Sequence, residues 1–123
     1  MRNVFFKRGS KYGNRKVSID GINFDSAVEA NRYRSLKLLE KNKHIGYITT
    51  QPKFVLQDKF KVNEKSERAI VYIADFRYFD FTLEKIVIED VKGFKTKEYK
   101  IKRKLLLFQI KENQLLLFRE ITK

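Results

Sequence analysis

The chain has 123 residues, 42% of them hydrophobic, and a formal net charge of +13. This length favours a single domain with one core, and the positive charge predicts a polyanionic partner, with nucleic acid as the leading candidate. The absence of cysteine excludes disulfides, thiolate zinc sites and cysteine nucleophiles, and it fits a reducing cytoplasm. No apolar run approaches the roughly 20 residues that span a bilayer, and the first residues lack the apolar segment of a secretory signal.

Residues 1–16 are predicted to form a flexible basic arm, because they carry six basic residues and no acid, and glycines interrupt any periodicity. Lys11 and Arg15 are candidate contacts to DNA phosphates. A solubilising tail explains the same composition. Residues 17–123 would then form the folded domain, beginning with a hairpin whose turn is Asp20-Gly21.

The first helix is predicted from Ser26 to Lys41, with a buried arc that includes Tyr33 and Leu36. Glu29 falls near the centre of this arc, where a carboxylate is costly unless it is paired or bound to metal. Ser26-x-x-Glu29 is also a capping box, which would give Glu29 a structural role. Both interpretations stay open.

The next segment, residues 47–57, reads as one strand in which Pro52 marks an edge or a bulge. Gln51 is either an active-site residue or a polar residue at the bend. Residues 59–68 are predicted to form a hairpin loop. His44, the only histidine, is expected in a surface loop.

Residues 69–79 and 85–93 contain two apolar, β-branched runs around a short break, which predicts a strand, a turn and a second strand. With the turn centred on residues 82 and 83, Asp75 lies opposite Asp90, although Thr-Leu is a poor two-residue turn and the register could shift by one or two residues. Alternation places Asp90 and Lys92 on one face of the second strand.

Facing carboxylates repel each other, because cross-strand Cβ atoms lie about 4.5–5.5 Å apart. A divalent cation such as Mg²⁺, held by carboxylates, water and substrate phosphate, would offset this repulsion. Lys92 would then lie near the attacking water or the scissile phosphate. A solvated strand face with weak Asp–Lys pairs is the alternative.

A second helix is predicted over residues 96–108, with Thr96 as N-cap and an apolar stripe formed by Ile101, Leu105 and Phe108. Basic residues dominate this stretch and predict contacts to duplex phosphates: Lys95, Lys97, Lys100, Arg103 and Lys104. A merely solvated helix face is the alternative. The apolar run at residues 114–121 predicts a last strand covered on both faces.

The succession FDSAVEANRY, QPKF, YIADFRY and EDVKGFKTKEYKIKRKLL, with Asp75 followed by Asp90-Val91-Lys92, resembles the PD-(D/E)XK nuclease superfamily. Within it, the pattern resembles small phage-encoded endonucleases described as Holliday-junction-resolvase-like, from about Lys11 to the end of the chain. The proline that usually precedes the first aspartate is Ala74 here.

The resemblance implies a single α/β domain with an αβββαβ core, in which a mixed central sheet is flanked by helices. It implies that Glu29, Asp75 and Asp90 hold Mg²⁺ or Mn²⁺, with the Val91 carbonyl as a further ligand, and that Gln51 lines the site. Lys92 would position the nucleophile and stabilise developing charge.

The expected activity is therefore metal-dependent DNA endonuclease cleavage, selective for branched DNA such as Holliday junctions, in phage DNA processing and recombination. A homodimer and a location in the cytoplasm of a bacterial host are part of this expectation. A non-catalytic basic nucleic-acid-binding protein, or an RNA-binding or ribosome-associated protein, would explain the charge equally well.

Overall fold

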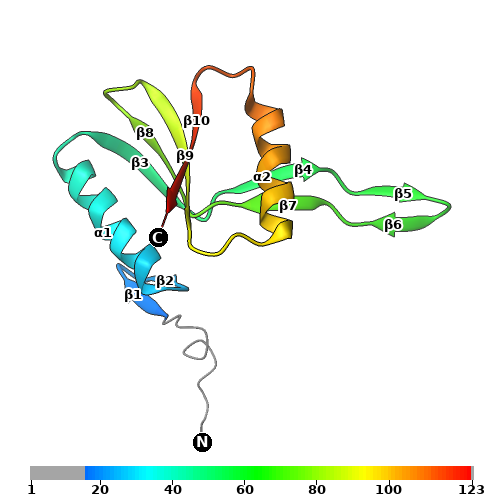
Figure 1. The fold of residues 1–123 in the computed structure, drawn as a ribbon, viewed down its shortest axis with the longest axis horizontal. Coiled ribbons are helices and arrows are strands. Elements are labelled where there is room, and N and C mark those ends of the chain that lie inside the picture. The colour runs from blue at the N-terminus through cyan, green and yellow to red at the C-terminus, as the bar shows by residue number, and fades with distance from the viewer. Residues whose placement is uncertain (1–15, 123) are drawn as a thin grey trace, which may run out of the picture. The chain divides into compact units, whose positions relative to one another are not determined.

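The computed structural model describes residues 16–122, which fall into two compact units, one ending at Asn42 and one beginning at Lys43. The predicted arm, with Lys11 and Arg15, lies outside the described residues except for Lys16, which is exposed. Both units are drawn in Figure 1.

The first unit contains a hairpin and a helix. Strands β1 (Val17–Ile19) and β2 (Ile22–Phe24) are antiparallel, and the turn residues Asp20 and Gly21 both have positive φ, as a two-residue type I′ turn requires. Helix α1 (Ala27–Lys41) follows. Its residue Tyr33 packs its ring against Phe24 and donates a hydrogen bond from its hydroxyl to Asp20 at 3.1 Å. The predicted hairpin and helix are thus confirmed.

The second unit is built on a mixed four-stranded sheet in the order β10-β9-β8-β3 (Figure 1). Strands β3 (Ile45–Thr50), β8 (Phe76–Asp80) and β9 (Lys85–Lys92) are antiparallel neighbours, and β10 (Leu116–Thr122) runs parallel to β9. Helix α2 (Lys97–Ile110) makes the crossover between β9 and β10. Residues 16–122 are therefore mixed α/β, with a mixed sheet and two helices, as expected.

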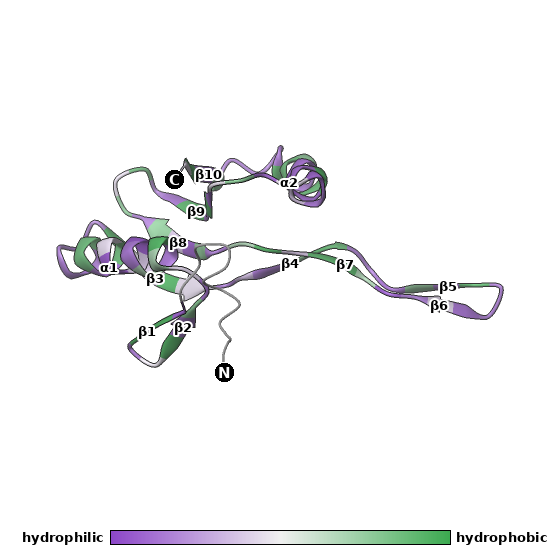
Figure 2. Ribbon diagram, turned by 60° about the horizontal axis from the view of Figure 1, so that its bottom comes forward, coloured by the Kyte–Doolittle hydropathy of each residue, from purple (hydrophilic) through white to green (hydrophobic). Residues whose placement is uncertain are grey.

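A long two-stranded ribbon leaves this sheet. Strand β4 (Lys53–Gln57) pairs with β7 (Ile70–Ile73), and the ribbon continues as β5 (Phe60–Val62) and β6 (Lys65–Glu67). Apolar residues concentrate on β5 and polar residues on β6 (Figure 2), and every residue of both strands is exposed. Residues 59–68, predicted as a hairpin loop, do form a hairpin, but its two arms are the paired strands β5 and β6.

Two expected strands are each broken in two, which corrects the sequence prediction. Residues 47–57 divide at Gln51 and Pro52 into β3 and β4, while residues 69–79 divide at Ala74 and Asp75 into β7 and β8. Hydrogen bonds from Gln51 N to Asp75 O at 2.9 Å and from Ala74 N to Pro52 O at 3.1 Å join the two breaks. The ribbon therefore leaves and re-enters the sheet beside Asp75.

Helix α2 covers the root of this ribbon and one end of the sheet. Its buried residues Tyr99 and Leu106 form a core cluster with Tyr72, Ala74 and Ile88. The predicted stripe of Ile101, Leu105 and Phe108 is wrong, because these side chains are 61%, 45% and 70% exposed. The buried face of the helix is instead formed by Tyr99 and Leu106, which lie on the opposite side.

The last strand also differs from expectation. Among the described strands, β10 pairs with β9 alone, so it is an edge strand of this sheet, and it is half-buried along most of its length instead of covered on both faces. Its apolar run reflects the contact of one face with α2, where Phe118 packs on the core cluster. No helix within residues 16–122 is long and apolar enough to cross a membrane.

Candidate functional site

The hairpin of β8 and β9 sets the position of the two predicted aspartates. Its pairs, from Asp80–Lys85 to Phe76–Glu89, follow the predicted register around residues 82 and 83. The loop has four residues, 81–84, and the Asp80 carboxylate caps it by accepting hydrogen bonds from Thr82 N and Leu83 N, each at 2.9 Å. The register is therefore confirmed, while the two-residue turn is not.

Asp75 lies just beyond the ladder, at the bend between β7 and β8. Its backbone N donates to Glu89 O at 3.1 Å, and its Oδ2 accepts a hydrogen bond from Val91 N at 2.7 Å. The side chain is thus held against the end of β9, next to Asp90. The bend also brings Gln51 to this place through its backbone, although the Gln51 side chain is exposed.

Asp90 is fully buried, and two residues of its own unit contact its carboxylate. The Tyr72 hydroxyl donates a hydrogen bond to Oδ2, and the Lys92 ammonium lies 3.3 Å from Oδ1. Oδ1 nevertheless accepts no hydrogen bond from the described residues. The cation that faces this buried oxygen is the Lys92 ammonium, and a buried carboxylate needs such a partner.

Lys92 is on the face that alternation predicts, and it borders an open space. Its ammonium lies 4.6 Å from the centre of the Tyr99 ring, a cation–π contact. A cavity of about 370 Å³ adjoins it, lined also by Tyr72, Tyr99 and Lys102. A phosphate group entering this cavity would meet the Lys92 side chain.

Sequence reasoning missed the two tyrosines that hold carboxylates at the site. Tyr99 donates a hydrogen bond to Glu120, which lies on β10 directly beside Asp90 in the parallel ladder. Burial, and then the hydrogen bond to the carboxylate, raises the pKa of Tyr72 and of Tyr99 well above the usual tyrosine range. Both phenols therefore act as donors at any physiological pH.

Glu120 in turn organises part of the basic surface. Its pKa is lowered by the Tyr99 hydrogen bond and by Lys95, whose ammonium lies 2.9 Å from Oε1. Arg103 Nε lies 3.7 Å from Oε2, and the Arg103 guanidinium lies 5.5 Å from the centre of the Phe118 ring. Lys95 and Arg103 thus have partners within the protein.

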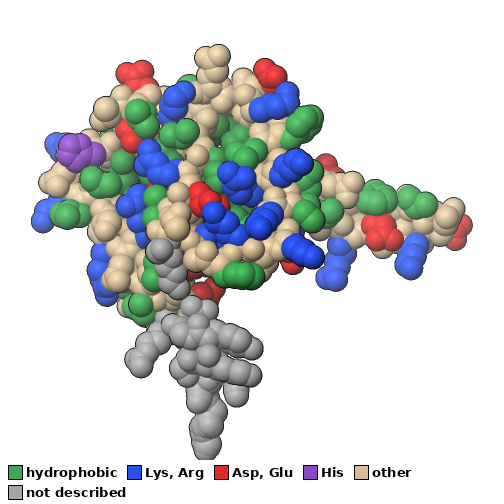
Figure 3. Space-filling model, viewed as in Figure 1, with side chains coloured by type: hydrophobic (Ala, Val, Ile, Leu, Met, Phe, Trp, Pro, Cys, Tyr) green, Lys and Arg blue, Asp and Glu red, His purple; other side chains and the backbone are tan. Residues whose placement is uncertain are grey.

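Four of the predicted DNA-binding residues nevertheless line one cavity. It measures about 560 Å³ and is formed by Lys95, Tyr99, Lys100, Arg103, Lys104 and Glu120. Figure 3 shows Lys and Arg side chains gathered near the lower end of α2. Four cations against one carboxylate make this cavity suited to anions. Lys97, which is also predicted to bind DNA, is exposed and is not part of the cavity lining.

Glu29 lies in the first unit, at the third position of α1. Ser26 is the N-cap, and its hydroxyl accepts a hydrogen bond from Glu29 N at 3.2 Å, so the Ser26 half of the capping box is confirmed. Among residues 16–122, no three acidic or histidine side chains form a group that could hold a metal ion. His44 is exposed in a loop, as predicted.

The donor set at Asp75 and Asp90 is compatible with a hard divalent cation. Carboxylate oxygens are the ligands that Mg²⁺ prefers, and one or two are commonly enough when water and phosphate complete the shell. Asp90 Oδ1 accepts no hydrogen bond from the described residues and lies 3.3 Å from the Lys92 ammonium, so a metal ion there would share this oxygen with Lys92. Together, these features define a mixed α/β protein with a carboxylate–lysine site next to a basic cavity.

The chain belongs to the family described as "Protein of unknown function (DUF1064)", whose model matches residues 9–122. No curated protein matches the chain. The family description names no activity, so the resemblance to the PD-(D/E)XK superfamily remains a prediction.

Proposed function

We propose that this protein is a Mg²⁺- or Mn²⁺-dependent DNA endonuclease that cleaves branched DNA such as Holliday junctions. The observation that carries the proposal is Asp90, a fully buried carboxylate whose Oδ1 accepts no hydrogen bond from the described residues and faces the Lys92 ammonium, with Asp75 held beside it. A purely structural carboxylate is expected to have both oxygens satisfied. The basic cavity on α2 and β10 supports a nucleic-acid substrate.

The order of elements gives further support. Helix α1, strands β3, β8 and β9, helix α2 and strand β10 follow one another as in the αβββαβ core that the resemblance implies, with the ribbon as an insertion. In that restriction-endonuclease-like arrangement, Glu29 would join Asp75 and Asp90 as a metal ligand, and Gln51 would line the site. The Val91 carbonyl is the remaining candidate ligand.

A metal ion at Asp75 and Asp90 would supply an activated water and neutralise charge on the scissile phosphate. The Tyr72 hydroxyl holds Asp90 in one orientation, and Val91 N holds Asp75. Lys92 would bind a non-bridging phosphate oxygen, where its charge counts most as negative charge develops. The cations around Glu120 would hold a neighbouring phosphate and keep the strand in place.

A non-catalytic nucleic-acid-binding protein is the second candidate, favoured by a specific observation. Tyr72 and Lys92 already contact the Asp90 carboxylate without any metal, so a structural role for this buried group is physically reasonable. Such a protein would use the basic cavity alone and would bind DNA equally well in a chelator.

The deciding experiment is cleavage of a panel of four-way junction, flap, linear duplex, single-stranded and circular DNA with Mg²⁺ or Mn²⁺. We expect the wild-type protein to cut branched DNA, and Asp90→Asn or Asp75→Asn to lower the rate by about a hundredfold or more. Asparagine keeps an acceptor for Tyr72 or Val91 N, so both variants should fold and still bind DNA. Asp58→Asn, in an exposed position outside the site, is the matched control.

Full activity of either site variant would overturn the assignment of these residues. Metal-independent binding without cleavage of any DNA in the panel would instead establish the second candidate. Equal cleavage of linear and branched DNA would support the nuclease activity but contradict the proposed selectivity for branched DNA.

A further inference from the structure

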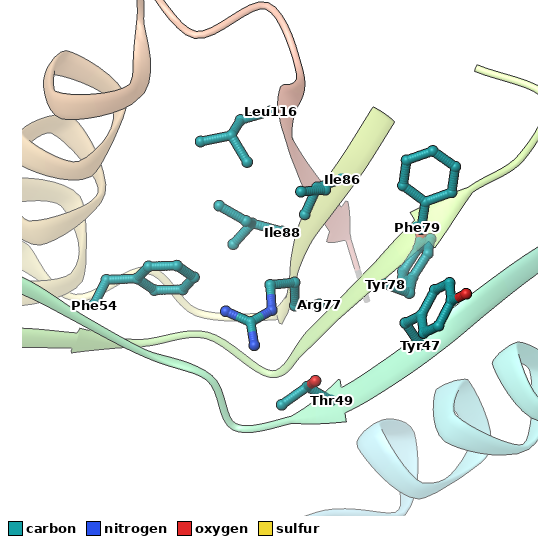
Figure 4. A pocket seen from close by; sticks show the side chains of 9 residues that line it. All are labelled: Tyr47, Thr49, Phe54, Arg77, Tyr78, Phe79, Ile86, Ile88 and Leu116. Carbon is teal, nitrogen blue, oxygen red and sulfur yellow. The ribbon is translucent and has the colours of Figure 1, made fainter. Parts of the chain in front are cut away.

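A third cavity lies on the sheet, and the proposed cleavage chemistry does not use it. It measures about 380 Å³ and has mainly apolar walls, formed by Phe54, Phe79, Ile86, Ile88 and Leu116 (Figure 4). This volume falls in the range of ordinary small-ligand sites. Ile86 and Ile88 share a face of β9 with Asp90, so the cavity and the candidate site lie along the same face of one strand.

Among the described residues that line this cavity, Arg77 is the charged one. Figure 4 shows its guanidinium pointing into the space between Phe54 and Thr49. The side chain is half-buried, and no described residue forms a hydrogen bond or an ion pair with it. A half-buried cation that lacks an acidic partner favours a ligand that brings negative charge or strong acceptors.

Tyr47 stands at the same cavity in a strained conformation. Its φ is +58°, a region that side-chain-bearing residues rarely occupy, at the point where the pairing of β3 with β8 shifts between Gly46 and Thr49. The ring is 79% exposed and touches Phe81 edge-on at 6.4 Å between centres. Strain of this kind concentrates at functional sites, and here it presents an aromatic face to solvent.

We infer that this cavity binds one unpaired nucleotide of a DNA strand. Its base would stack on Tyr47 and the apolar wall, and its phosphate or a base acceptor would pair with Arg77. A nucleotide combines a flat ring with an anion, as the lining requires, and the net charge of +13 favours a polyanion over an acidic peptide. The inference draws its substrate class from the proposed function, because unpaired nucleotides occur at branch points, but binding itself needs neither metal nor cleavage.

The test is binding of a short oligothymidine with one central 2-aminopurine to the full-length protein in a chelator. We expect Arg77→Gln and Tyr47→Ala each to weaken binding about tenfold, since stacking on one aromatic residue contributes about that factor. The fluorescence of 2-aminopurine should be quenched by the wild-type protein and by Tyr47→Phe, but not by Tyr47→Ala. Lys65→Gln, on exposed β6, removes the same charge as Arg77→Gln and should change affinity less than twofold.

Three results would overturn the inference: wild-type affinity in both cavity variants, an equal loss in Lys65→Gln, or dissociation of a protein dimer by Arg77→Gln in light scattering. The last would mean that a second copy occupies the cavity. Because Tyr47 is exposed, its variants should keep the melting temperature, which separates lost binding from lost folding. A protein that binds the oligonucleotide in this way but cuts no DNA would refute the proposed nuclease and leave the nucleotide site standing.

Discussion

Asp90 illustrates how a single buried charge can be tolerated. Its carboxylate has no exposed surface, yet the Tyr72 hydroxyl and the Lys92 ammonium both reach it. A buried carboxylate without such partners would be strongly destabilising. Oδ1 accepts no hydrogen bond from the described residues and is paired with the Lys92 ammonium at 3.3 Å, so this oxygen is stabilised by charge.

Tyr72→Phe should therefore destabilise the protein by about 1–3 kcal/mol at neutral pH, because it removes a buried hydrogen bond to a charged acceptor. The pKa of Tyr72 is raised in the folded state, mainly by burial, whereas the unfolded tyrosine titrates near pH 10. The stabilising contribution of Tyr72 is thus present below about pH 10 and is lost as the pH rises further, at up to about 1.4 kcal/mol per pH unit.

Urea unfolding across the range from about pH 8 to about pH 11 measures this effect. The wild-type protein should lose stability steeply above pH 10, and Tyr72→Phe should lose it less steeply. A phenolate absorbance titration that shows every tyrosine ionising near pH 10 in the folded protein would contradict the assignment.

At this scale, the sequence predicted Asp75, Asp90 and Lys92 as neighbours because alternation and register are local properties of a hairpin. It missed Tyr72 and Glu120 for a physical reason. Tyr72 lies on β7 of the ribbon, outside the sheet that contains Asp90. Glu120 lies on β10, which pairs in parallel with β9 but follows it in the chain only after helix α2. Neither relation leaves a periodic signal in the sequence.

Helix α2 divides its solvent-facing surface between charge and apolar groups. Lys97, Lys100 and Lys104 are exposed on one side of it, and the stripe of Ile101, Leu105 and Phe108 is exposed beside them. Tyr99 and Leu106 hold the opposite face in the core. The apolar residues at helical spacing that the sequence shows do lie on one side of α2, but that side is exposed to solvent and is not the buried face.

Exposed lysines of α2 should contribute to DNA affinity without reading sequence. Replacing Lys100 and Lys104 together by Gln should weaken binding similarly for all duplexes and reduce the salt slope by about 0.9 per lost phosphate contact. Arg103 is less informative, because it pairs with Glu120 and packs on Phe118. Affinity measured from low to moderate salt, with Lys65→Gln as control, provides the test, and an unchanged slope would place the DNA elsewhere.

Helix α1 offers a separate test of the two roles considered for Glu29. Ser26→Ala removes the side-chain acceptor for Glu29 N and should cost about 1 kcal/mol of stability. Glu29→Gln keeps a capping partner but removes the charge that a metal ligand needs. If Glu29→Gln cleaves DNA at the wild-type rate and only its melting temperature changes, Glu29 is a cap and not a ligand.

At the scale of the whole molecule, the elements were predictable but their distribution between sheets was not. The sequences around Gln51 and Ala74 each read as one continuous strand, because both halves are apolar and β-branched. In the structure, hydrogen bonds between the two breaks divert β4 and β7 into a ribbon. Such a diversion depends on two distant segments bending together, and a single segment carries no sign of it except Pro52.

The last prediction concerns assembly. Resolving a four-way junction needs two symmetric cuts, and one carboxylate–lysine site can supply one, so we expect a two-fold dimer on branched DNA. The sequence offers two apolar segments for a dimer contact. Val4, Phe5 and Phe6 lie outside the described residues, and most of the run from Leu115 to Phe118 belongs to strand β10. The stripe of Ile101, Leu105 and Phe108 on α2 is a better candidate, because three large apolar side chains at helical spacing are exposed together.

Leu105→Glu should therefore convert a dimer into a monomer, since it places a charge in the centre of an apolar contact. The melting temperature should change little, because the side chain is already partly exposed. Light scattering at micromolar concentration, alone and with a junction, measures the assembly, and the nicking pattern shows whether paired cuts become single nicks. Glu98→Gln, at an exposed position of the same helix, is the control. A wild-type protein that stays monomeric on the junction and cuts linear duplex equally well would exclude junction resolution and leave a simple metal-dependent nuclease.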